Sequence, residues 1–410
     1  MTLTLDGAPI GAEEGEPVAV SLVGAGVSSF ARSPKFHRPR GPACLRAACD
    51  GCLARVDEEP NVMTCRVAAR EGLTVTSQNI LGSRKVDLLR MTDWFFPDGM
   101  NHHELFAGVP GVQGLMQSFA RRVAGLGKLP REVRAPRPAL RREVDVVVVG
   151  SGPSGMAAAL ALASRGRQVE ILDDALAMGG TALALGFTAG PFAGLLESFV
   201  AGLGGALKLR LATTAGGFFG KDLLVLGDAG VELLQAKDVV LAMGAHDGVA
   251  PFEGNDLPGV MSARAACRFL AHGVLVGERL VVCSAPDAGP FGLHIARAAR
   301  AAGAEVTSIP RLPDAVLGAS RVEGVAVVEG GERVVYDADA LLIDLPPAPS
   351  YELALQAGAT VLHEPRGYVV VPEGGKIAGG IWAVGELVGT KLEASVVMAE
   401  ASRVASAICA

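Results

Sequence analysis

The sequence lacks several features that would direct a protein to a membrane or to nucleic acid. No apolar run approaches the roughly 18–20 residues that a membrane-spanning helix needs. The N-terminus lacks the basic and then apolar regions of a secretory signal. The formal net charge of −6 over 410 residues offers no basic field for nucleic acid. The basic stretch from Arg131 to Arg142 is interrupted by prolines, and we interpret it as a solvated linker.

Motifs of several other enzyme classes are also missing. The sequence has no catalytic triad, zincin helix or P-loop, and Cys267 and Cys283 do not form the C-x-x-C pair of dithiol enzymes. We interpret these two as buried apolar thiols. Of the seven cysteines, four lie within 22 residues, which favours metal ligation in a reducing compartment over disulfides. We therefore expect a cytoplasmic protein, which a partner could hold at the inner membrane.

The texture of the sequence divides the chain into three regions. Residues 1–82 alternate short apolar runs with turn residues, as small β-rich domains do. These runs are Thr2–Leu5, Val18–Leu22 and Leu73–Thr76. Residues 83–140 form an irregular connector with one predicted helix, Leu115–Leu126. From Glu143 onward, β-runs alternate with Ala-rich helices, which indicates an α/β fold with two nested Rossmann-like units.

The clustered cysteines have the spacing Cys44-x4-Cys49-x2-Cys52-x12-Cys65. A plant-type 2Fe–2S site uses C-x4-C-x2-C plus one further cysteine, so that a loop folds over the cluster and three thiolates converge from one segment. Small residues between these ligands allow such a loop. Structural zinc is the competing interpretation, but zinc ribbons favour paired C-x2-C knuckles and this segment has one such pair. We predict a 2Fe–2S cluster.

A dinucleotide-binding βαβ unit opens at Val144. The apolar run Val146–Val149 leads into Gly150-Ser151-Gly152-Pro153-Ser154-Gly155, and a helix follows to about Arg165. The first glycine permits the tight turn, the second lets a pyrophosphate approach the backbone, and the third allows close packing of helix and strand. The next strand, Gln168–Leu172, ends in Asp173, 18 positions after the third glycine, with Asp174 as the alternative. A carboxylate there accepts from ribose hydroxyls and favours FAD or NAD.

The second βαβ unit, with strand Arg279–Cys283 and helix Phe291–Ala302, lacks this fingerprint. No three glycines stand at the needed separations, and Asp287 would repel a pyrophosphate. The strand Glu305–Ile309 also ends without an acidic residue. We therefore expect no nicotinamide dinucleotide in the usual mode, although less regular contacts with an adenine nucleotide stay open.

Three segments resemble motifs of two-dinucleotide-binding flavoproteins, and this resemblance selects FAD over NAD. Met178-Gly179-Gly180-Thr181 resembles their double-glycine segment, Val239–Ala245 their A-T-G strand, and Ile381–Glu386 their C-terminal G-D motif, with Glu386 replacing aspartate. The resemblance implies flavin contacts by the backbone of Gly385 and Glu386, and by the helix from about Glu393 to Ile408. The full predicted FAD set is Gly150, Gly152, Pro153, Ser154, Gly155, Asp173, Asp174, Gly180, Thr181, Ala242, Gly244, Gly385 and Glu386.

Further segments resemble the α-subunit family of heterotetrameric sarcosine oxidase, hydrogen cyanide synthase, opine oxidase and dye-linked proline dehydrogenase. They are Phe36-His37-Arg38-Pro39-Arg40-Gly41, Pro60-Asn61-Val62, Gly125-Leu126-Gly127-Lys128 and Asp256-Leu257-Pro258-Gly259-Val260-Met261. The implied fold is an α/β, glutathione-reductase-like, two-dinucleotide-binding FAD domain behind an N-terminal β-grasp ferredoxin-like domain. We expect the ferredoxin-like domain at 1–82, the connector at 83–140, the FAD domain at 141–253 and 345–410, and an inserted domain at 254–344. The folate domain and second cysteine-rich module of some relatives are not expected.

The same resemblance implies an FAD- and 2Fe–2S-dependent oxidoreductase, or a subunit of one, that acts on the CH–NH group of amines or amino acids. Electrons would pass from the flavin through the cluster, and a flavoprotein β-subunit would oxidise the substrate. An NAD(P)H-dependent ferredoxin-type reductase and a non-catalytic electron-transfer subunit are the alternatives. We assign no catalytic residue.

The histidines carry weaker signals. His102 and His103 adjoin aromatic residues in the connector, where a structural role is the better interpretation. His246 follows the A-T-G-like strand and is a candidate neighbour of the cofactor. His37 is expected to hold the small domain against the flavin domain by hydrogen bonding.

Overall fold

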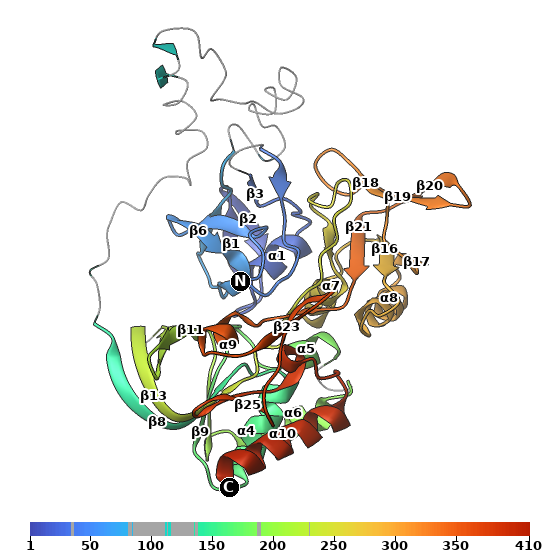
Figure 1. Ribbon diagram of the computed structural model, residues 1–410. Coiled ribbons are helices and arrows are strands. Elements are labelled where there is room, and N and C mark those ends of the chain that lie inside the picture. The colour runs from blue at the N-terminus through green and yellow to red at the C-terminus, as the bar shows by residue number, and fades with distance from the viewer. Residues whose placement is uncertain are drawn as a thin grey trace.

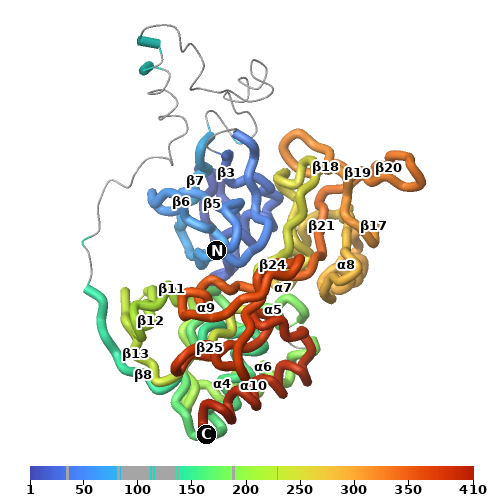
Figure 2. Tube along the Cα trace, in the orientation of Figure 1, coloured from blue at the N-terminus to red at the C-terminus, as the bar shows by residue number. Residues whose placement is uncertain are grey.

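A computed structural model describes residues 1–33, 37–80, 138–186, 190–228 and 230–410, with isolated positions between 84 and 135. Three sheet-containing bodies are visible: a small one at the N-terminus, a large one holding the C-terminus, and one beside both (Figures 1 and 2). His102, His103 and nearly all of the predicted helix Leu115–Leu126 lie outside the described residues. Among the helices described, none is long and apolar enough to cross a bilayer.

The N-terminal body is a five-stranded sheet with one helix packed on it. The strands lie in the order β2 (Ala8–Gly11), β1 (Thr2–Leu5), β7 (Thr74–Thr76), β5 (Leu53–Val56) and β6 (Glu59–Met63). Strands β1 and β2 form an antiparallel hairpin, whereas β1 and β7 pair in parallel. Parallel pairing requires a crossover connection in the chain between β1 and β7. This mixed sheet with a packed helix confirms the β-grasp expectation.

One element of the N-terminal body differs from the expectation. Val18–Leu22 is not an extended apolar run but forms helix α1 (Val18–Gly24), with all five residues buried. In a short, mostly apolar segment, the spacing of the apolar residues does not distinguish a strand from a helix. Packing against the sheet therefore decided that this segment is helical.

The large body is built around a parallel sheet in the order β10 (Leu207–Arg210), β9 (Val169–Leu172), β8 (Leu140–Val149), β13 (Gly230–Leu241). Antiparallel β12 (Asp222–Gly227) and β11 (Thr214–Phe219) continue beyond β13, and β26 (Ile381–Ala383) pairs with β13 and β25 (Lys376–Ala378). Val146–Val149 are at most 7% exposed, as a central parallel strand covered on both faces requires. Helices α4 (Pro153–Ala163), α6 (Ala193–Gly202) and α10 (Ala394–Cys409) pack together on one side (Figure 1).

The third body is a four-stranded parallel sheet, in the order β15 (Val260–Ser262), β21 (Ala340–Asp344), β16 (Arg279–Ser284), β17 (Glu305–Ile309). It carries α7 (Ala263–Ala271), α8 (Phe291–Ala301) and the antiparallel strands β18 (Ala315–Leu317), β19 (Gly324–Glu329) and β20 (Glu332–Asp337). The segment that returns to the large body contains β22 (Ala348–Pro349), α9 (Glu352–Gln356), β23 (Val361–Glu364) and β24 (Gly367–Val370). Two sheets of Rossmann type joined in this way confirm the predicted fold class, whereas the domain boundaries stay a prediction.

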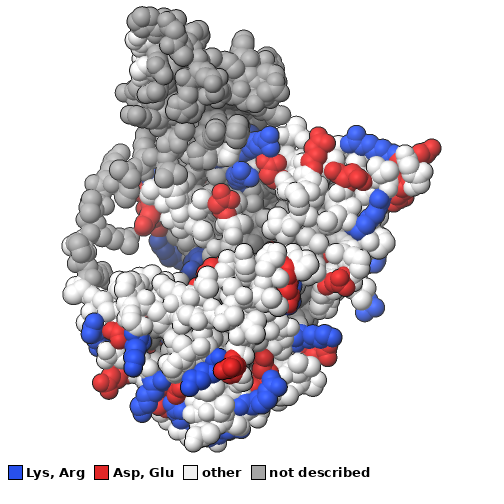
Figure 3. All heavy atoms as spheres, viewed as in Figure 1, with Lys and Arg blue, Asp and Glu red and all other residues white. Residues whose placement is uncertain are grey.

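The N-terminal body meets the third body through two segments that the sequence had marked separately. Arg38 and Arg40, of which Arg40 is in β4 (Pro39–Arg40, paired with β3, Ala31–Arg32), lie 3.3 Å and 3.9 Å from Asp256. The carbonyl of His37 accepts from Arg32 inside the N-terminal body at 2.9 Å. The expected hydrogen bonding of His37 toward the flavin domain stays a prediction. On the face shown in Figure 3, basic and acidic side chains of the described residues are interspersed.

Candidate functional site

Three of the clustered cysteines, Cys44, Cys49 and Cys52, lie on the loop before strand β5, and Cys65 lies in turn η1 (Thr64–Arg66). Cys44 donates to Cys49, with 3.3 Å between the sulfurs, and Cys52 is hydrogen-bonded to Cys65. Within the residues that the structure describes, no three His, Cys, Asp or Glu side chains are placed to hold a single metal ion. The four thiols form two pairs, and a 2Fe–2S cluster takes two protein ligands on each of its two irons.

The loop is shaped so that backbone amides face these sulfurs. The hydrogen bond from Cys44, followed by amides of Ala43 and Gly51, lowers the pKa of Cys49 to about 6 against the raising effect of burial. The pKa of Cys52 is lowered too, first by its bond with Cys65. Each pair thus has one thiol that ionises readily, and thiolates are the form that ligates iron.

Backbone conformation in the loop is unusual for its residue types. Leu45 and Ala47 have φ angles of 48° and 58°, in the left-handed region that side chains other than glycine rarely adopt. A Cβ on Gly51 would lie 2.0 Å from the carbonyl oxygen of Gly41, so glycine is needed there. Such strain concentrates at functional sites. The local geometry therefore fits a 2Fe–2S cluster.

The glycine loop between β8 and α4 has the geometry that its sequence predicted. Gly150 has φ of 104°, and a Cβ there would meet the carbonyl of Ala242 at 2.4 Å. A Cβ on Gly155 would meet the carbonyl of Gly150 at 1.9 Å, whereas one on Gly152 would have nothing within 4 Å. Two glycines are thus required by packing, and the third borders open space beside the N-terminus of α4. That terminus, with Pro153 first and Ser154 next, favours a phosphate group.

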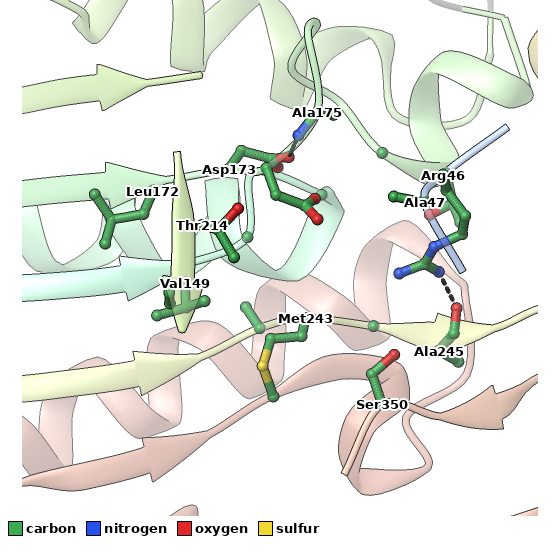
Figure 4. Close-up of a pocket in the computed structure, with 18 of the residues that line it drawn as sticks. Arg46, Ala47, Val149, Leu172, Asp173, Ala175, Thr214, Met243, Ala245 and Ser350 are labelled. Carbon is green, nitrogen blue, oxygen red and sulfur yellow. Dashed lines mark hydrogen bonds between the residues drawn. The ribbon is translucent and has the colours of Figure 1, made fainter. Parts of the chain in front are cut away.

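Asp173 follows β9 at the edge of the glycine loop. Its carboxylate accepts from the backbone and hydroxyl of Ser151, both at 2.6 Å, and from the backbone of Ala175 at 2.9 Å (Figure 4). Asp174 instead lies 3.3 Å from Arg66, which the N-terminal body contributes. Burial raises the pKa of Asp174, partly against the effect of Arg66. The two neighbouring carboxylates therefore have different surroundings.

The other predicted cofactor residues converge on the same loop. Gly179 donates to Ser151, and a Cβ on Gly180 would lie 3.1 Å from Gly152. Thr181 begins α5 (Thr181–Ala184) beside them. Gly385, at the start of η3 (Gly385–Val388), has φ of 85°, and a Cβ there would lie 2.4 Å from the hydroxyl of Ser154.

A single cavity of about 660 Å³ joins these groups, within the usual range of roughly 300–1,000 Å³ for cofactor pockets. Of the predicted FAD residues, Gly155 alone does not line it, because it packs under the loop. Leu45, Ala47 and Cys65 line the same cavity. Figure 4 shows Ala47 beside Arg46 at its edge. The cluster loop therefore forms one wall of the predicted nucleotide site.

Polar residues that line this cavity and that sequence reasoning missed include Arg46, Arg66, Arg268 and Ser350. Arg46 donates to the carbonyl of Ala245 in β14 (Ala245–His246), and Arg66 also donates to Thr214 at 3.1 Å. Arg268 donates to the carbonyl of Cys44 at 2.5 Å and to Asp247 at 2.9 Å. Position within two residues of a cluster cysteine was the available signal for Arg46 and Arg66, but a basic residue in a loop is usually a solvated one.

The candidate residue His246 does line the cavity. It is 40% exposed, with Nε2 3.6 Å from Glu352. Cys267 and Cys283 are at most 1% exposed, and burial raises the pKa of each thiol to about 12. The interpretation of these two cysteines as buried apolar thiols fits this burial.

The corresponding site in the third body is already filled by the protein. The carboxylate of Asp344, at the end of β21, accepts from the backbone of Gly292 at the start of α8 at 2.7 Å. A Cβ on Gly292 would lie 2.5 Å from Ser284 and 2.8 Å from Asp344. A buried carboxylate thus sits where a βαβ unit would otherwise receive a phosphate.

Comparisons with known proteins match the N-terminal part of the chain and the part that follows the connector to two different families. A family model of the 2Fe-2S iron-sulfur cluster binding domain matches residues 1–80, and one of pyridine nucleotide-disulphide oxidoreductase matches residues 144–323. The sarcosine oxidase subunit alpha of Rhizobium meliloti is 30% identical over 75% of this chain and 34% of its own length. Hydrogen cyanide synthase subunit HcnB of Pseudomonas aeruginosa is 31% identical over 40% of this chain and 37% of its own. These matches confirm the predicted cofactors, FAD and a 2Fe–2S cluster.

A solved structure shares the fold of the whole chain. L-proline dehydrogenase from P. horikoshii superposes with a TM-score of 0.74 at 23% identity, covering 100% of this chain and 72% of that chain. The chain spans about a third of the length of the sarcosine oxidase subunits that it matches, 34% in each of two cases.

Proposed function

This chain belongs to the sarcosine oxidase alpha-subunit family of FAD- and 2Fe–2S-dependent oxidoreductases, and from that premise we propose that it serves the oxidation of an amine or amino acid at a CH–NH group. Its role is electron handling, and a flavoprotein β-subunit oxidises the substrate. Two relatives support the substrate class and the partner, since sarcosine oxidase subunit alpha is named for an amine substrate and both it and hydrogen cyanide synthase subunit HcnB are named as subunits.

One structural observation carries this proposal. Residues of the cluster loop and residues of the glycine loop line the same cavity. FAD accepts two electrons together and releases them singly, whereas a 2Fe–2S cluster carries one electron at a time. A site that brings the two together suits a chain that divides electron pairs between a two-electron donor and a one-electron acceptor.

The residues of the chain have separate proposed tasks in this site. The amides at the N-terminus of α4 and the open backbone of Gly152 hold the pyrophosphate, and Asp173 orients a ribose. Thr181, Ala242, Gly244 and the backbone of Gly385 and Glu386 enclose the remainder, with Asp174 held by Arg66 at the edge. Cys44, Cys49, Cys52 and Cys65 ligate the cluster.

The alternative of an NAD(P)H-dependent reductase is disfavoured by one observation. Asp344 accepts from the first turn of α8, so its negative charge would meet the phosphates of a dinucleotide bound in the usual mode. Electrons therefore come from an organic substrate or from another subunit.

An anaerobic titration of the purified chain separates these functions. NADH is added to one sample, and sarcosine, proline, glycine or an opine with an artificial dye acceptor to others, while the flavin absorbance is followed. Rapid bleaching by NADH would reject the proposal. Mass spectrometry of the nucleotide released on denaturation checks the cofactor assignment, which FMN or a nicotinamide dinucleotide in place of FAD would contradict.

Copurification from the native host tests the partner. We expect a second flavoprotein chain to accompany this one, and amine-dependent dye reduction to require both. If the chain alone oxidises an amine at the rate of the complex, the proposed division of labour is wrong.

A further inference from the structure

One residue connects the cluster loop to the nucleotide cavity by two different groups. The backbone amide of Arg46 donates to the sulfur of Cys44 at 3.4 Å. Its side chain leaves the loop and donates to the carbonyl of Ala245, on the opposite wall (Figure 4). Ala245 follows Gly244 directly, and the carbonyl of Gly244 accepts from the backbone of Ser350 at 3.0 Å. Arg46 therefore touches a cluster ligand at one end and the wall of the predicted FAD site at the other.

The guanidinium group of Arg46 has no carboxylate as an ion-pair partner among the described residues of this part of the molecule. Four guanidinium groups and four carboxylates interact here: Arg46, Arg66, Arg264, Arg268, Asp173, Asp174, Asp247 and Glu386. Asp173 accepts hydrogen bonds from Ser151 and Ala175. Each carboxylate has another partner, since Asp174 pairs with Arg66, Asp247 with Arg268 and Glu386 with Arg264. Among the described residues, the side chain of Arg46 donates to the neutral carbonyl of Ala245.

A positive charge close to a redox centre acts on the reduction potential of that centre. Reduction adds negative charge to a cluster, and a cation at short range in a partly desolvated site stabilises that charge. Although burial opposes it, Arg268 and Arg264 hold the pKa of Asp247 at about 2, so this carboxylate remains charged and partly offsets the cation.

We infer that Arg46 is a positioning residue that couples the two redox centres: its side chain holds the cluster loop against the nucleotide cavity, and its charge raises the reduction potential of the cluster. The inference rests on the proposed assignment of that cavity to FAD and of the four cysteines to the cluster. If the charge of Arg46 acts on the cluster, neutralising Arg46 should lower the reduction potential, and neutralising the neighbouring Asp247 should raise it.

The test is a redox titration of the cluster in the full, cofactor-loaded chain, with dithionite as reductant and electron paramagnetic resonance as the readout. Arg46→Gln keeps a donor near Ala245 but removes the charge, and Arg46→Lys keeps the charge. We expect Arg46→Gln to make the cluster about tenfold harder to reduce, which is about 59 mV for one electron. Arg46→Lys should retain the wild-type potential, and the nearly isosteric Asp247→Asn should raise it.

Arg70→Gln is the matched control, because Arg70 also lies near a cluster cysteine in sequence but is 60% exposed and paired with Asp57. It should leave the potential unchanged. A wild-type potential in Arg46→Gln, or an equal fall in Arg46→Lys, overturns the inference. If Arg46→Gln fails to assemble a cluster, Asp247→Asn decides, and an unchanged or lower potential there overturns it. The titration contains no amine, so its result is independent of whether the proposed substrate class is right.

Discussion

Arg264 on α7 and Glu386 on η3 form a two-pronged ion pair, with distances of 2.5 and 3.2 Å between their nitrogens and oxygens. The pair joins the third body to the wall of the cavity, and both side chains are largely buried, with 6% and 13% exposure. The guanidinium also lies over the ring of Phe291, 4.5 Å from its centroid. The family resemblance implied a flavin contact by the backbone of Glu386, and the structure shows that its carboxylate is engaged by Arg264.

Glu386→Ala should therefore destabilise the chain as well as loosen the cofactor. Removing one partner leaves an uncompensated buried cation, which costs about 3–5 kcal/mol of unfolding free energy. Chemical denaturation measures this, with Arg279→Ala as the control for an exposed pair to Asp339 that should cost much less. A double variant, Arg264→Met with Glu386→Ala, should recover much of the loss. Equal costs for Glu386→Ala and Arg279→Ala would contradict this account.

Gly385→Ala should reduce retention of the bound nucleotide. The new Cβ combines a left-handed φ with a clash against the hydroxyl of Ser154, on the first turn of α4. Gly273→Ala has a similar φ of 74° but meets nothing within 4 Å, so it isolates the backbone cost of about 1–2 kcal/mol. Gel filtration followed by absorbance of the released nucleotide gives the comparison. Adding Ser154→Gly to Gly385→Ala should restore part of the occupancy, and no restoration would show that the clash is not the cause.

Asp344 should make stability depend on pH between about 4 and 6. Burial raises the pKa of its carboxyl to about 6, against an ordinary 3.8. The folded state therefore binds a proton more readily than the unfolded state, so this group favours folding below about pH 4 and loses that contribution as pH rises to 6. Asp344→Asn should remove the dependence and stabilise the chain at pH 7 by on the order of 2 kcal/mol. Thermal unfolding across this range checks the effect, with exposed Asp337→Asn as control; parallel curves for wild type and Asp344→Asn would refute it.

Replacing either member of a thiol pair should abolish the cluster. Cys44→Ser and Cys65→Ser remove one proposed ligand from each pair, and we expect loss of bound iron and sulfide with near-complete loss of the cluster absorbance. Cys409→Ser, at an exposed position, should leave both unchanged. Full iron content in Cys65→Ser would contradict the assignment of the second pair.

The glycine loop and the cysteine spacing could be predicted from the sequence because their chemistry is local. Gly155 must be glycine owing to its contact with Gly150 inside one βαβ unit. Cys44, Cys49 and Cys52 lie on one loop, so their spacing specifies which thiols come together. The parallel strand Val146–Val149 could also be predicted, because a strand that is buried on both faces has a continuous apolar sequence. The helical conformation of Val18–Leu22 could not be predicted, because all five residues are buried and their spacing shows no helical periodicity.

Contacts between the bodies were decided by tertiary structure alone. Arg46 reaches Ala245 across 199 positions of sequence, and Arg66 reaches Asp174 across 108. A long, flexible basic side chain is compatible with solvent or with many partners, and only the docking of one folded surface on another selects among them. The sequence thus determined which cofactor motifs the chain carries, and packing between the bodies placed the two motifs on a single cavity.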